Sequence, residues 1–488
     1  MHGRKAFPTV VIGAGLSGLA AALLLSRRGI PVMVVEAQDG AGGCCSTEAF
    51  DGYTFNNGAV YVAVPSLLRA SFRRLGISFD DEVQLIPIAR PHVTHLDNGT
   101  TVHLSTAENS HVEGADGNSR TRQLREGLTK LHNDWHPIYR ALVCDVLPEE
   151  PSLVRTFGKL WKYLPRMGGH INKLIASYFP DGDLQAAVAS TLLYTGLPPD
   201  QLPSTQIIGL LALLEEGFHL PRGGMGAISA ALLRHLQDQS VPVRFGAKVK
   251  EIAVENGQVR GVVLSDGERI NTSHVIATCS GLGVVKTLLR PDAIPRRLAA
   301  KADKAPLSHS AISIQIGYSG APASDAFIVN HVPAMDKQGA VHTLTPEVPR
   351  WISYTQPTQV FSDLAPEGKN IIELYAPATG IQSASGWDKA WSDAVVERYL
   401  RALRQRVPEL TVERTRVLDP QDFAQERHLH EGALYGIAPG ASPSKFLPHR
   451  TQIAGLYLGG QTTFPGYGVP SAILSGIQSA ESLVADLS

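Results

Sequence analysis

The sequence predicts an α/β fold, and three neighbouring patterns support this class. Residues 8–12 are a β-branched run without a charged residue, typical of a strand buried on both faces of a parallel sheet. Residues 16–28 are rich in Ala and Leu and favour a helix that ends before Gly29. Residues 32–36 form a second buried run. The three segments predict a β-α-β unit.

Three glycines follow the first strand at the spacing of a dinucleotide-binding turn. Gly13 permits the tight turn, Gly15 lets the backbone approach a pyrophosphate, and Gly18 lets helix and strand pack closely. The phosphates would lie at the helix N-terminus, where free N–H groups favour an anion. Glu36 ends the second strand and is placed to accept hydrogen bonds from a ribose. The pattern predicts a Rossmann-type domain.

Length and composition limit the other function classes. A chain of 488 residues is long enough for two or three domains. A net charge of −1 supplies no basic surface of the kind that nucleic acids require, so we expect no nucleic-acid partner. The sequence contains no run of 18 or more uncharged apolar residues, so we expect no helix that spans a bilayer. The sequence carries no signal for a particular oligomeric state.

The N-terminus and the cysteines indicate a cytoplasmic protein. The first 26 residues have the composition of a secretory signal, but glycines interrupt the apolar stretch and a second strand follows. Four cysteines do not make a disulfide framework in a chain of this size. Adjacent Cys44 and Cys45 could be a redox pair or soft metal ligands. Because the Cys-x-x-Cys spacing is absent, we favour two small packed residues.

Further glycine-rich segments extend the ligand site beyond one nucleotide. Residues 40–47 (GAGGCCST) and 52–60 (GYTFNNGAV) allow a second backbone approach to a large ligand, and residues 456–472 (LYLGGQTTFPGYGVPSA) combine a strand, a glycine turn and a helix start. Here the sequence resembles the FAD-dependent amine oxidase and phytoene desaturase superfamily, and closely its phytoene desaturase and carotenoid isomerase branch. The resemblance covers nearly the whole chain and implies FAD. It departs at Cys44, where many members have Arg, and at Asn56, where Asp is common.

The resemblance also implies which residues contact FAD. The segment around Gly13 would hold the ADP half, and residues 460–469 would face the flavin ring. A helix N-terminus directed at the ring would stabilise the negative charge that develops there on reduction. The expected cofactor-binding residues are Gly13, Ala14, Gly15, Ser17, Gly18, Glu36, Ala37, Gly43, Cys44, Gly58, Ala59, Val249, Gly460, Gln461, Gly468 and Val469.

The residues after the first glycine segments alternate between helical and strand patterns. We expect a helix over 66–76, strands over 79–104 and a mobile surface loop over the polar segment 106–120. Residues 123–216 have a helical period broken by prolines, which predicts a helical subdomain. Its most apolar run, 204–214, would be a core helix, or else the wall of a lipophilic tunnel or a membrane-contacting surface.

The chain then returns to the cofactor. Residues 221–233 match the superfamily segment that precedes the adenosine-side strand, here 247–254, and Asn256-Gly257 predicts a two-residue hairpin. Strands in the 306–410 region, with a helix over 392–406, would cover the substrate. We therefore expect a discontinuous FAD-binding domain of residues 1–70, 218–290 and 410–488, and a substrate-binding region of residues 71–217 and 291–409 that includes a helical subdomain around 123–217.

One missing lysine bears on the chemistry that the resemblance implies. Amine oxidases commonly carry a lysine on the strand before the substrate sheet, and the comparable stretch 307–314 (LSHSAISI) has none. Residues 91–100 and 430–436 are similar to segments of the desaturase branch. Against this, Phe464 and Tyr467 could place aromatic rings at the flavin face, as in an amine oxidase. Packing is the other interpretation of Tyr467.

The catalytic residues are open at this point. Glu215 and Glu216 are candidate bases, with Tyr467 and Phe464 as candidate pocket residues. We find no Ser-His-Asp or paired-carboxylate arrangement. His92, His95 and His103 have mixed strand spacings, and His428 with His430 would share a strand face. No carboxylate or cysteine completes a set of ligands, so we expect no metal site.

The sequence thus predicts an FAD-dependent oxidoreductase that acts on C–C or C=C bonds of a hydrophobic polyene, isoprenoid or secondary-metabolite substrate. Loss of a hydride and a proton from adjacent carbons would give a new double bond, and reduced flavin could instead isomerise or saturate one. Two alternatives stay open: a flavin amine oxidase that makes an imine and hydrogen peroxide, and a non-catalytic flavin-containing module at a membrane. We expect a cytoplasmic location with peripheral membrane contact as a further option.

Overall fold

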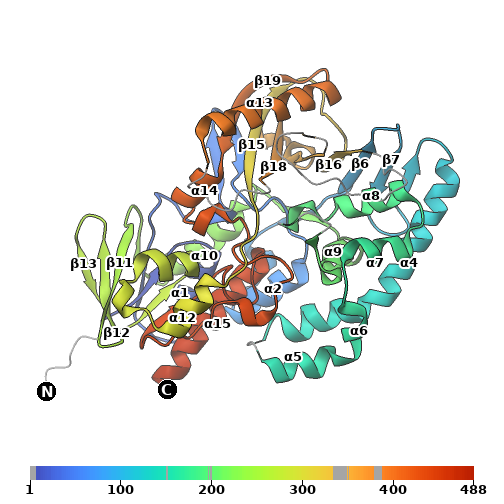
Figure 1. Cartoon of the computed structure of the whole chain (residues 1–488). Coiled ribbons are helices and arrows are strands. Elements are labelled where there is room, and N and C mark those ends of the chain that lie inside the picture. The colour runs from blue at the N-terminus through green and yellow to red at the C-terminus, as the bar shows by residue number, and fades with distance from the viewer. Residues whose placement is uncertain are drawn as a thin grey trace, which may run out of the picture.

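The computed structural model describes residues 7–149, 152–195, 197, 201–333, 349, 351–378 and 387–488. Within this part of the chain the strands form a five-stranded, a three-stranded and an eight-stranded sheet, with two two-stranded pairs. Figure 1 shows the longest strands crowded at one end of the molecule and a group of helices from the first half of the chain beside them.

A five-stranded parallel sheet forms the centre of the nucleotide-binding half. The strand order is β10-β2-β1-β14-β20. Val10 pairs with Met33 on one side and with Val275 on the other, and every residue of β1 is buried, which explains its apolar sequence. The predicted β-α-β unit is confirmed. The strands come from distant parts of the chain: β1 (Thr9–Ile12), β2 (Val32–Val35), β10 (Val243–Arg244), β14 (Val275–Ala277) and β20 (Leu456–Leu458).

Helices from the two ends of the chain pack directly on each other beside this sheet. They are α1 (Leu16–Arg27) and α15 (Val469–Leu487), with α10 (Gly226–Asp238) next to α1. A Cβ on Gly476 would lie 2.0 Å from the Ser17 carbonyl oxygen, and one on Gly459 would lie 2.9 Å from Ser17 Oγ. Only glycine permits this approach at 476, so the N- and C-terminal segments form one packed unit.

A three-stranded antiparallel sheet follows α10 and β10 in the chain. Its strands are β11 (Val249–Glu255), β12 (Gln258–Leu264) and β13 (Arg269–Asn271). Asn256 and Gly257 have φ of 51° and 72°, the left-handed values that a two-residue hairpin needs, so the predicted hairpin is confirmed. Figure 1 shows this sheet at the margin of the molecule.

The other half is built on an eight-stranded sheet of order β19-β15-β18-β17-β16-β6-β7-β8. Helix α13 (Lys389–Arg406) contributes Val395 and Leu403 to the same apolar cluster as Ile312 and Ile314 of the sheet. β19 begins at Thr411, within the segment expected to belong to the FAD-binding domain, and pairs with β15. The strands are β6 (His92–Leu96), β7 (Thr101–Leu104), β8 (His111–Glu113), β15 (Ser310–Ser319), β16 (Ile328–Val332), β17 (Ile352–Thr355), β18 (Lys369–Ala378) and β19 (Thr411–Leu418).

Two short strand pairs and several helices connect the two halves. The pairs are β3 (Thr47–Phe50) with β4 (Tyr53–Asn56), and β5 (Leu85–Pro87) with β9 (His219–Pro221). The helices include α2 (Pro65–Arg74), α3 (Phe79–Glu82), α4 (Gly117–Arg140), α5 (Leu153–Leu160), α6 (Leu164–Met167), α7 (Ile171–Tyr178), α8 (Gly182–Ser190), α9 (Ile208–Glu216), α11 (Gly281–Gly283), α12 (Arg296–Asp303) and α14 (Pro420–Gln425).

Two local predictions were wrong. Residues 79–82 form the short helix α3 and not a strand. The segment 106–120, expected to be a mobile loop, contains strand β8 and the first turn of α4. β8 has only three residues and its outer side faces solvent, so its sequence shows no apolar run. Its pairing with β7, which no local pattern records, supplies the backbone hydrogen bonds.

The most apolar predicted helix is largely a core helix, because Leu210, Leu211 and Leu213 of α9 are at most 1% exposed. Its segment also meets the other interpretation in part, since Thr205, Gln206, Ile208 and Gly209 line a cavity. Within the described ranges, we find no helix with the length and hydropathy needed to cross a bilayer.

Candidate functional site

A large cavity lies where the sheets and helices meet. Its volume is about 1670 Å³, and its walls come from both halves of the molecule. The carboxyl ends of four parallel strands open into it, at Ile12, Val35, Thr278 and Gly460. This is the edge of an open α/β sheet at which ligands bind, beside the point where the strand order reverses.

The N-terminus of α1 faces this cavity. Gly13 (φ of 102°) and Gly15 line the wall, and no heavy atom outside the adjacent chain lies within 4 Å of a Cβ built on Gly15. The helix has no side-chain cap, and Ser17 Oγ is buried without a hydrogen-bond partner in the described residues. A Cβ on Gly18 would lie 1.9 Å from the Gly13 carbonyl oxygen. These features leave polar donors and space for a phosphate.

Glu36 is held by the backbone at the end of β2. Its Oε2 accepts a hydrogen bond of 2.6 Å from the Ala14 amide, and its Oε1 accepts one of 2.9 Å from the Gln38 amide. The side chain is buried at the cavity wall, next to Ala37 and on the same wall as Val249. These two bonds fix the orientation of the carboxylate, and its remaining lone pairs can accept hydrogen bonds from the two hydroxyl groups of a diol.

The second glycine segment forms the adjoining wall. Gly43, Cys44, Gly58 and Ala59 line the cavity, and the Ala59 amide donates to the Cys44 carbonyl at 2.9 Å. A Cβ on Gly58 would lie 2.6 Å from that carbonyl oxygen. Burial raises the pKa of the Cys44 thiol, against a smaller opposite effect of Arg427. A neutral, closely packed thiol agrees with the interpretation of Cys44 as a packing residue.

The C-terminal segment completes the site. Gly460, Gln461, Gly468 and Val469 line the cavity, and Pro470 opens α15 in its first turn. The N-terminus of α15 therefore meets the cavity wall, and its dipole favours negative charge there. Gln461 Nε2 is a buried donor with no partner among the described residues.

Two polar residues of the site were missed by the sequence analysis as ligand contacts. Arg427 and His428 line the cavity after α14, and Arg427 Nε and His428 Nε2 are buried without hydrogen-bond partners in the described ranges. No motif marked Arg427, and His428 was assigned to a strand that does not form. Unpaired buried polar groups are costly unless a ligand or water satisfies them. With Ser17 and Gln461 they fit a large, polar, phosphate-bearing cofactor such as FAD.

The rest of the cavity is lined mainly by tyrosines and aliphatic side chains. The Tyr61 and Tyr194 rings lie 6.2 Å apart, and those of Tyr435 and Tyr467 lie 4.8 Å apart, both pairs edge to face. The Tyr467 hydroxyl donates to Gln206 Oε1 at 3.0 Å. Burial raises the pKa of each of these four phenols, so they stay protonated at neutral pH. This half of the cavity is apolar and offers hydroxyl donors.

The other candidate pocket residues lie elsewhere. Phe464 does not line the cavity, and neither does Glu215 nor Glu216. Glu215 faces His132 and His136 of α4, while Glu216 accepts hydrogen bonds from Ser66 and the Tyr139 hydroxyl. Both carboxylates thus join α9 to its neighbours. Ala14 and Gly18 also lie behind the cavity wall and act through the backbone of the turn.

The described lysines of the cavity wall are confined to the adenosine side. They are Lys248 and Lys250, at the start of β11. The stretch that would carry the amine-oxidase lysine contributes His309, Ser310 and Ala311 to the wall.

Comparisons with known proteins place this architecture in a family. The family described as flavin containing amine oxidoreductase matches residues 16–484. A zeta-carotene-forming phytoene desaturase from Myxococcus xanthus is 26% identical over 97% of this chain and 93% of its own. A lycopene-forming phytoene desaturase from Pseudescherichia vulneris is 25% identical over 98% and 99% of the two chains. A redesigned putrescine oxidase shares the fold, with a TM-score of 0.65, 15% identity and 99% of both chains covered. The chain therefore belongs to the flavin-containing amine oxidoreductase family and is an FAD-dependent oxidoreductase.

Proposed function

We propose that this enzyme desaturates a hydrophobic polyene or isoprenoid substrate. The observation that carries the proposal is the substrate half of the cavity, whose lining is aromatic and aliphatic and, among the described residues, without a lysine. The full-length similarity to proteins named phytoene desaturases supports the same substrate class. Amine oxidation has the shared fold and the Tyr435–Tyr467 ring pair on the cavity wall in its favour, but the putrescine oxidase likeness is at only 15% identity.

In this proposal the protein positions FAD and the substrate, and the cofactor carries out the redox chemistry. Bound FAD supplies the hydride acceptor, and the adjacent substrate carbon loses a proton to water or a base. The N-terminus of α1 and Ser17 Oγ bind the phosphates, and Glu36 binds the ribose. The N-terminus of α15 stabilises negative charge on the ring. Tyr61, Tyr194 and their neighbours exclude water from the polyene.

Anaerobic mixing tests the reaction class. We expect phytoene or 4,4'-diapophytoene in liposomes to bleach the flavin absorbance near 450 nm and to yield a product with a longer conjugated system. Bleaching by putrescine or benzylamine alone would overturn the proposal in favour of amine oxidation. Isomerised product without net flavin reduction would replace desaturation by isomerisation. Saturated product formed by dithionite-reduced enzyme, with reoxidation of its flavin, would replace it by saturation. No bleaching by either class, with flavin bound, would indicate the non-catalytic alternative.

A variant pair tests the cavity. Gly209 lines it, and the nearest atom to a Cβ at this position is Leu192 Cδ2 at 3.9 Å. Gly209→Ala should therefore react normally, whereas Gly209→Leu extends into the cavity and should slow flavin reduction by phytoene about tenfold or more. Dithionite should reduce both variants at the same rate. Equal rates with phytoene would remove this part of the cavity from the substrate path.

We further propose that the enzyme takes its substrate from an anionic membrane surface on the cytoplasmic side. Val154, Phe157, Trp161 and Leu164, on α5, the turn after it and α6, are 85, 63, 59 and 48% exposed. Their spacing places them on one helical face. Residues 152–167 also contain four basic residues and no acidic one. Three of them pair with carboxylates of neighbouring segments, Arg155 with Glu149, Lys159 with Asp145 and Arg166 with Asp134, so the attraction to anionic lipid rests mainly on exposed Lys162.

The position of this surface relative to the cavity supports substrate transfer. The helical segment Ala141–Val146 precedes and packs against α5, and Val143 of this segment lines the cavity. Figure 1 shows α5 and α6 projecting from the body of the molecule. The four cysteines are free, as suits a reducing compartment.

Vesicle flotation tests the membrane contact. We expect binding to vesicles containing phosphatidylglycerol and weaker binding to pure phosphatidylcholine. Replacing Phe157 and Trp161 with Ser should abolish it. Replacing Phe245, which is 37% exposed and lies outside this surface, should leave it unchanged. Vesicle binding that survives the Phe157 and Trp161 replacements would refute this surface.

A further inference from the structure

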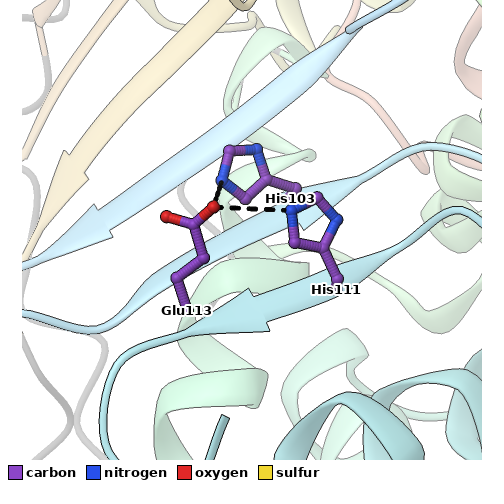
Figure 2. Close-up of side chains that lie close together, drawn as sticks. All are labelled: His103, His111 and Glu113. Atoms are coloured by element: carbon purple, nitrogen blue, oxygen red, sulfur yellow. Dashed lines mark ion pairs between the residues drawn. The ribbon is translucent and has the colours of Figure 1, made fainter. Parts of the chain in front are cut away.

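Three potential metal ligands meet at the edge of the eight-stranded sheet, outside the cavity. His103 lies on β7, and His111 and Glu113 lie on β8. His103 is paired directly with His111, and Glu113 is paired with Thr101. Because alternate residues of a strand point to the same face, all three side chains leave the sheet on one side. Figure 2 shows the two imidazoles and the carboxylate turned toward one another.

The distances between these side chains match ligands that share an ion. The Nε2 atoms of His103 and His111 lie 3.4 and 3.6 Å from Glu113 Oε1, and the ligand atoms of all three lie within 4.8 Å of one another. Charge-assisted hydrogen bonds are shorter, about 2.7–2.9 Å. Atoms bound to one tetrahedral zinc ion at ~2.0–2.1 Å stand roughly 3.4 Å apart. The distances to Glu113 therefore leave room for a cation, and the two imidazoles, which stack with centroids 4.3 Å apart and an interplanar angle of 6°, have to rotate to direct both nitrogens at it.

The ring nitrogens of the two imidazoles are placed to serve as ligands. His111 Nδ1 lies 3.3 Å from the Asn109 carbonyl oxygen, an acceptor, so in this geometry Nδ1 is the donor and Nε2 is directed at Glu113. His103 Nε2 is buried and has no hydrogen-bond partner in the described part of the chain.

We propose that His103, His111 and Glu113 bind a divalent transition-metal ion of the zinc class, with water as the remaining ligand. Imidazole suits Zn²⁺, Ni²⁺ and Cu²⁺, whereas Ca²⁺ and Mg²⁺ prefer oxygen ligands. The His111 and Glu113 side chains are 44 and 62% exposed, so the ion enters from solvent. It links β8, the last strand of the sheet, to β7.

A second cluster supplies a control. His132, His136 and Glu215 also bring two imidazoles to a carboxylate. There, His132 Nε2 lies 2.7 Å from Glu215 Oε1, which is the length of a direct hydrogen bond, and His136 approaches the same oxygen. That carboxylate is satisfied without an ion.

Calorimetric titration of the FAD-loaded, full-length protein with ZnCl₂ at pH 7.5, after removal of bound metal with EDTA, tests the site. We expect saturable binding by the wild type, at least tenfold weaker binding by His111→Ala and by Glu113→Gln, and wild-type binding by His132→Ala. MgCl₂ should give no saturable heat. Flavin absorbance and thermal melting without metal should be the same for all variants, which establishes that they fold.

Three outcomes would overturn the proposal. They are no saturable Zn²⁺ binding by the wild type, unchanged binding by folded His111→Ala and Glu113→Gln, and loss of binding in His132→Ala instead. The last result would place the ion at the second cluster.

Discussion

Replacing Glu373 with glutamine is expected to remove a pH-dependent loss of stability from the contact between the two halves of the enzyme. Glu373 of β18 is fully buried. Its Oε1 accepts a hydrogen bond of 2.7 Å from the Asn56 amide, and its Oε2 accepts bonds from Thr355 Oγ1 at 3.0 Å and from Asn56 Nδ2 at 3.4 Å. Burial outweighs these bonds and raises the pKa of the carboxyl from 4.5 to about 7.

The size of the effect follows from this change. The difference between the unfolded-state pKa of 4.5 and the folded-state pKa of about 7 corresponds to about 3 kcal/mol of unfolding free energy. Since the folded-state pKa is the higher one, the contribution is fully present below pH 4.5 and is lost as the pH rises to about 7. Glutamine does not ionise and keeps its stability across this window. The glutamine side chain places an N–H donor against the Asn56 Nδ2 donor, and this contact costs about 1 kcal/mol. The wild type has already lost about 1 kcal/mol of this contribution at pH 5, so we expect the variant to be about as stable as the wild type at pH 5 and about 2 kcal/mol more stable at pH 8.

Thermal unfolding of the FAD-saturated protein, followed by tryptophan fluorescence from pH 5 to pH 8, measures this difference. An unfolding entropy of about 2 cal/mol/K per residue implies a shift of about 1 °C per kcal/mol for a chain of this length. The variant's Tm relative to wild type should therefore rise by about 2 °C between pH 5 and pH 8. Glu268→Gln is the control, because Arg244 lowers the pKa of that exposed carboxyl. Parallel profiles for the wild type and Glu373→Gln would refute the reasoning.

Three further substitutions test the cofactor site. Gly476→Ala should separate α15 from α1, because its Cβ would lie 2.0 Å from the Ser17 carbonyl oxygen; we expect a loss of about 3 kcal/mol and of bound flavin, measured by melting and by absorbance at 450 nm. Gly158→Ala, with no heavy atom within 4 Å, is its control and should be neutral or stabilising, so equal losses would contradict the packing argument. Glu36→Gln should weaken FAD binding about tenfold or more, because the hydrogen bonds to the ribose lose their charge. Equilibrium dialysis of the FAD-free protein measures this, and unchanged affinity would remove Glu36 from the site. Tyr467→Phe deprives Gln206 Oε1 of its donor and should cost about 1–2 kcal/mol while slowing flavin reduction by substrate. An unchanged Tm and rate would make this hydroxyl dispensable.

The departure from the family at residue 56 has a structural explanation. Asn56 Oδ1 accepts a hydrogen bond of 2.9 Å from the Met225 amide, while its Nδ2 donates to Glu373. An aspartate at 56 would bring a second carboxylate against a buried one. The amide serves both neighbours, and this pairing is invisible in either local sequence because the two residues lie on different sheets.

Much of the proposed FAD site could be predicted from the sequence, because its determinants are local. A strand, a glycine turn and a helix N-terminus are consecutive in the chain, so the spacing of Gly13, Gly15 and Gly18 carries the geometry directly. The same holds for the turn before α15. The unpaired donors of Arg427 and His428 were missed because their position depends on a loop that no local pattern specifies.

The proposed metal site could not be predicted from the sequence for a related reason. His111 and Glu113 lie in a polar segment whose composition indicates a loop, and they join His103 only because β8 pairs with β7. Likewise, Glu215 and Glu216 were candidate bases from their position before the cofactor segment, whereas packing of α9 against α4 and α2 turns them away from the cavity.

The sequence by itself determined the fold class, the cofactor and the family of this enzyme, because the glycine spacing and the apolar strand runs that specify them occur in consecutive residues. The tertiary structure decided how the distant segments meet: the contact of α1 with α15, the buried Asn56–Glu373 pair, the aromatic lining of the cavity and the ligand cluster on β7 and β8. These contacts join residues far apart in the chain, and their free energy depends on burial and distance, which no local pattern encodes.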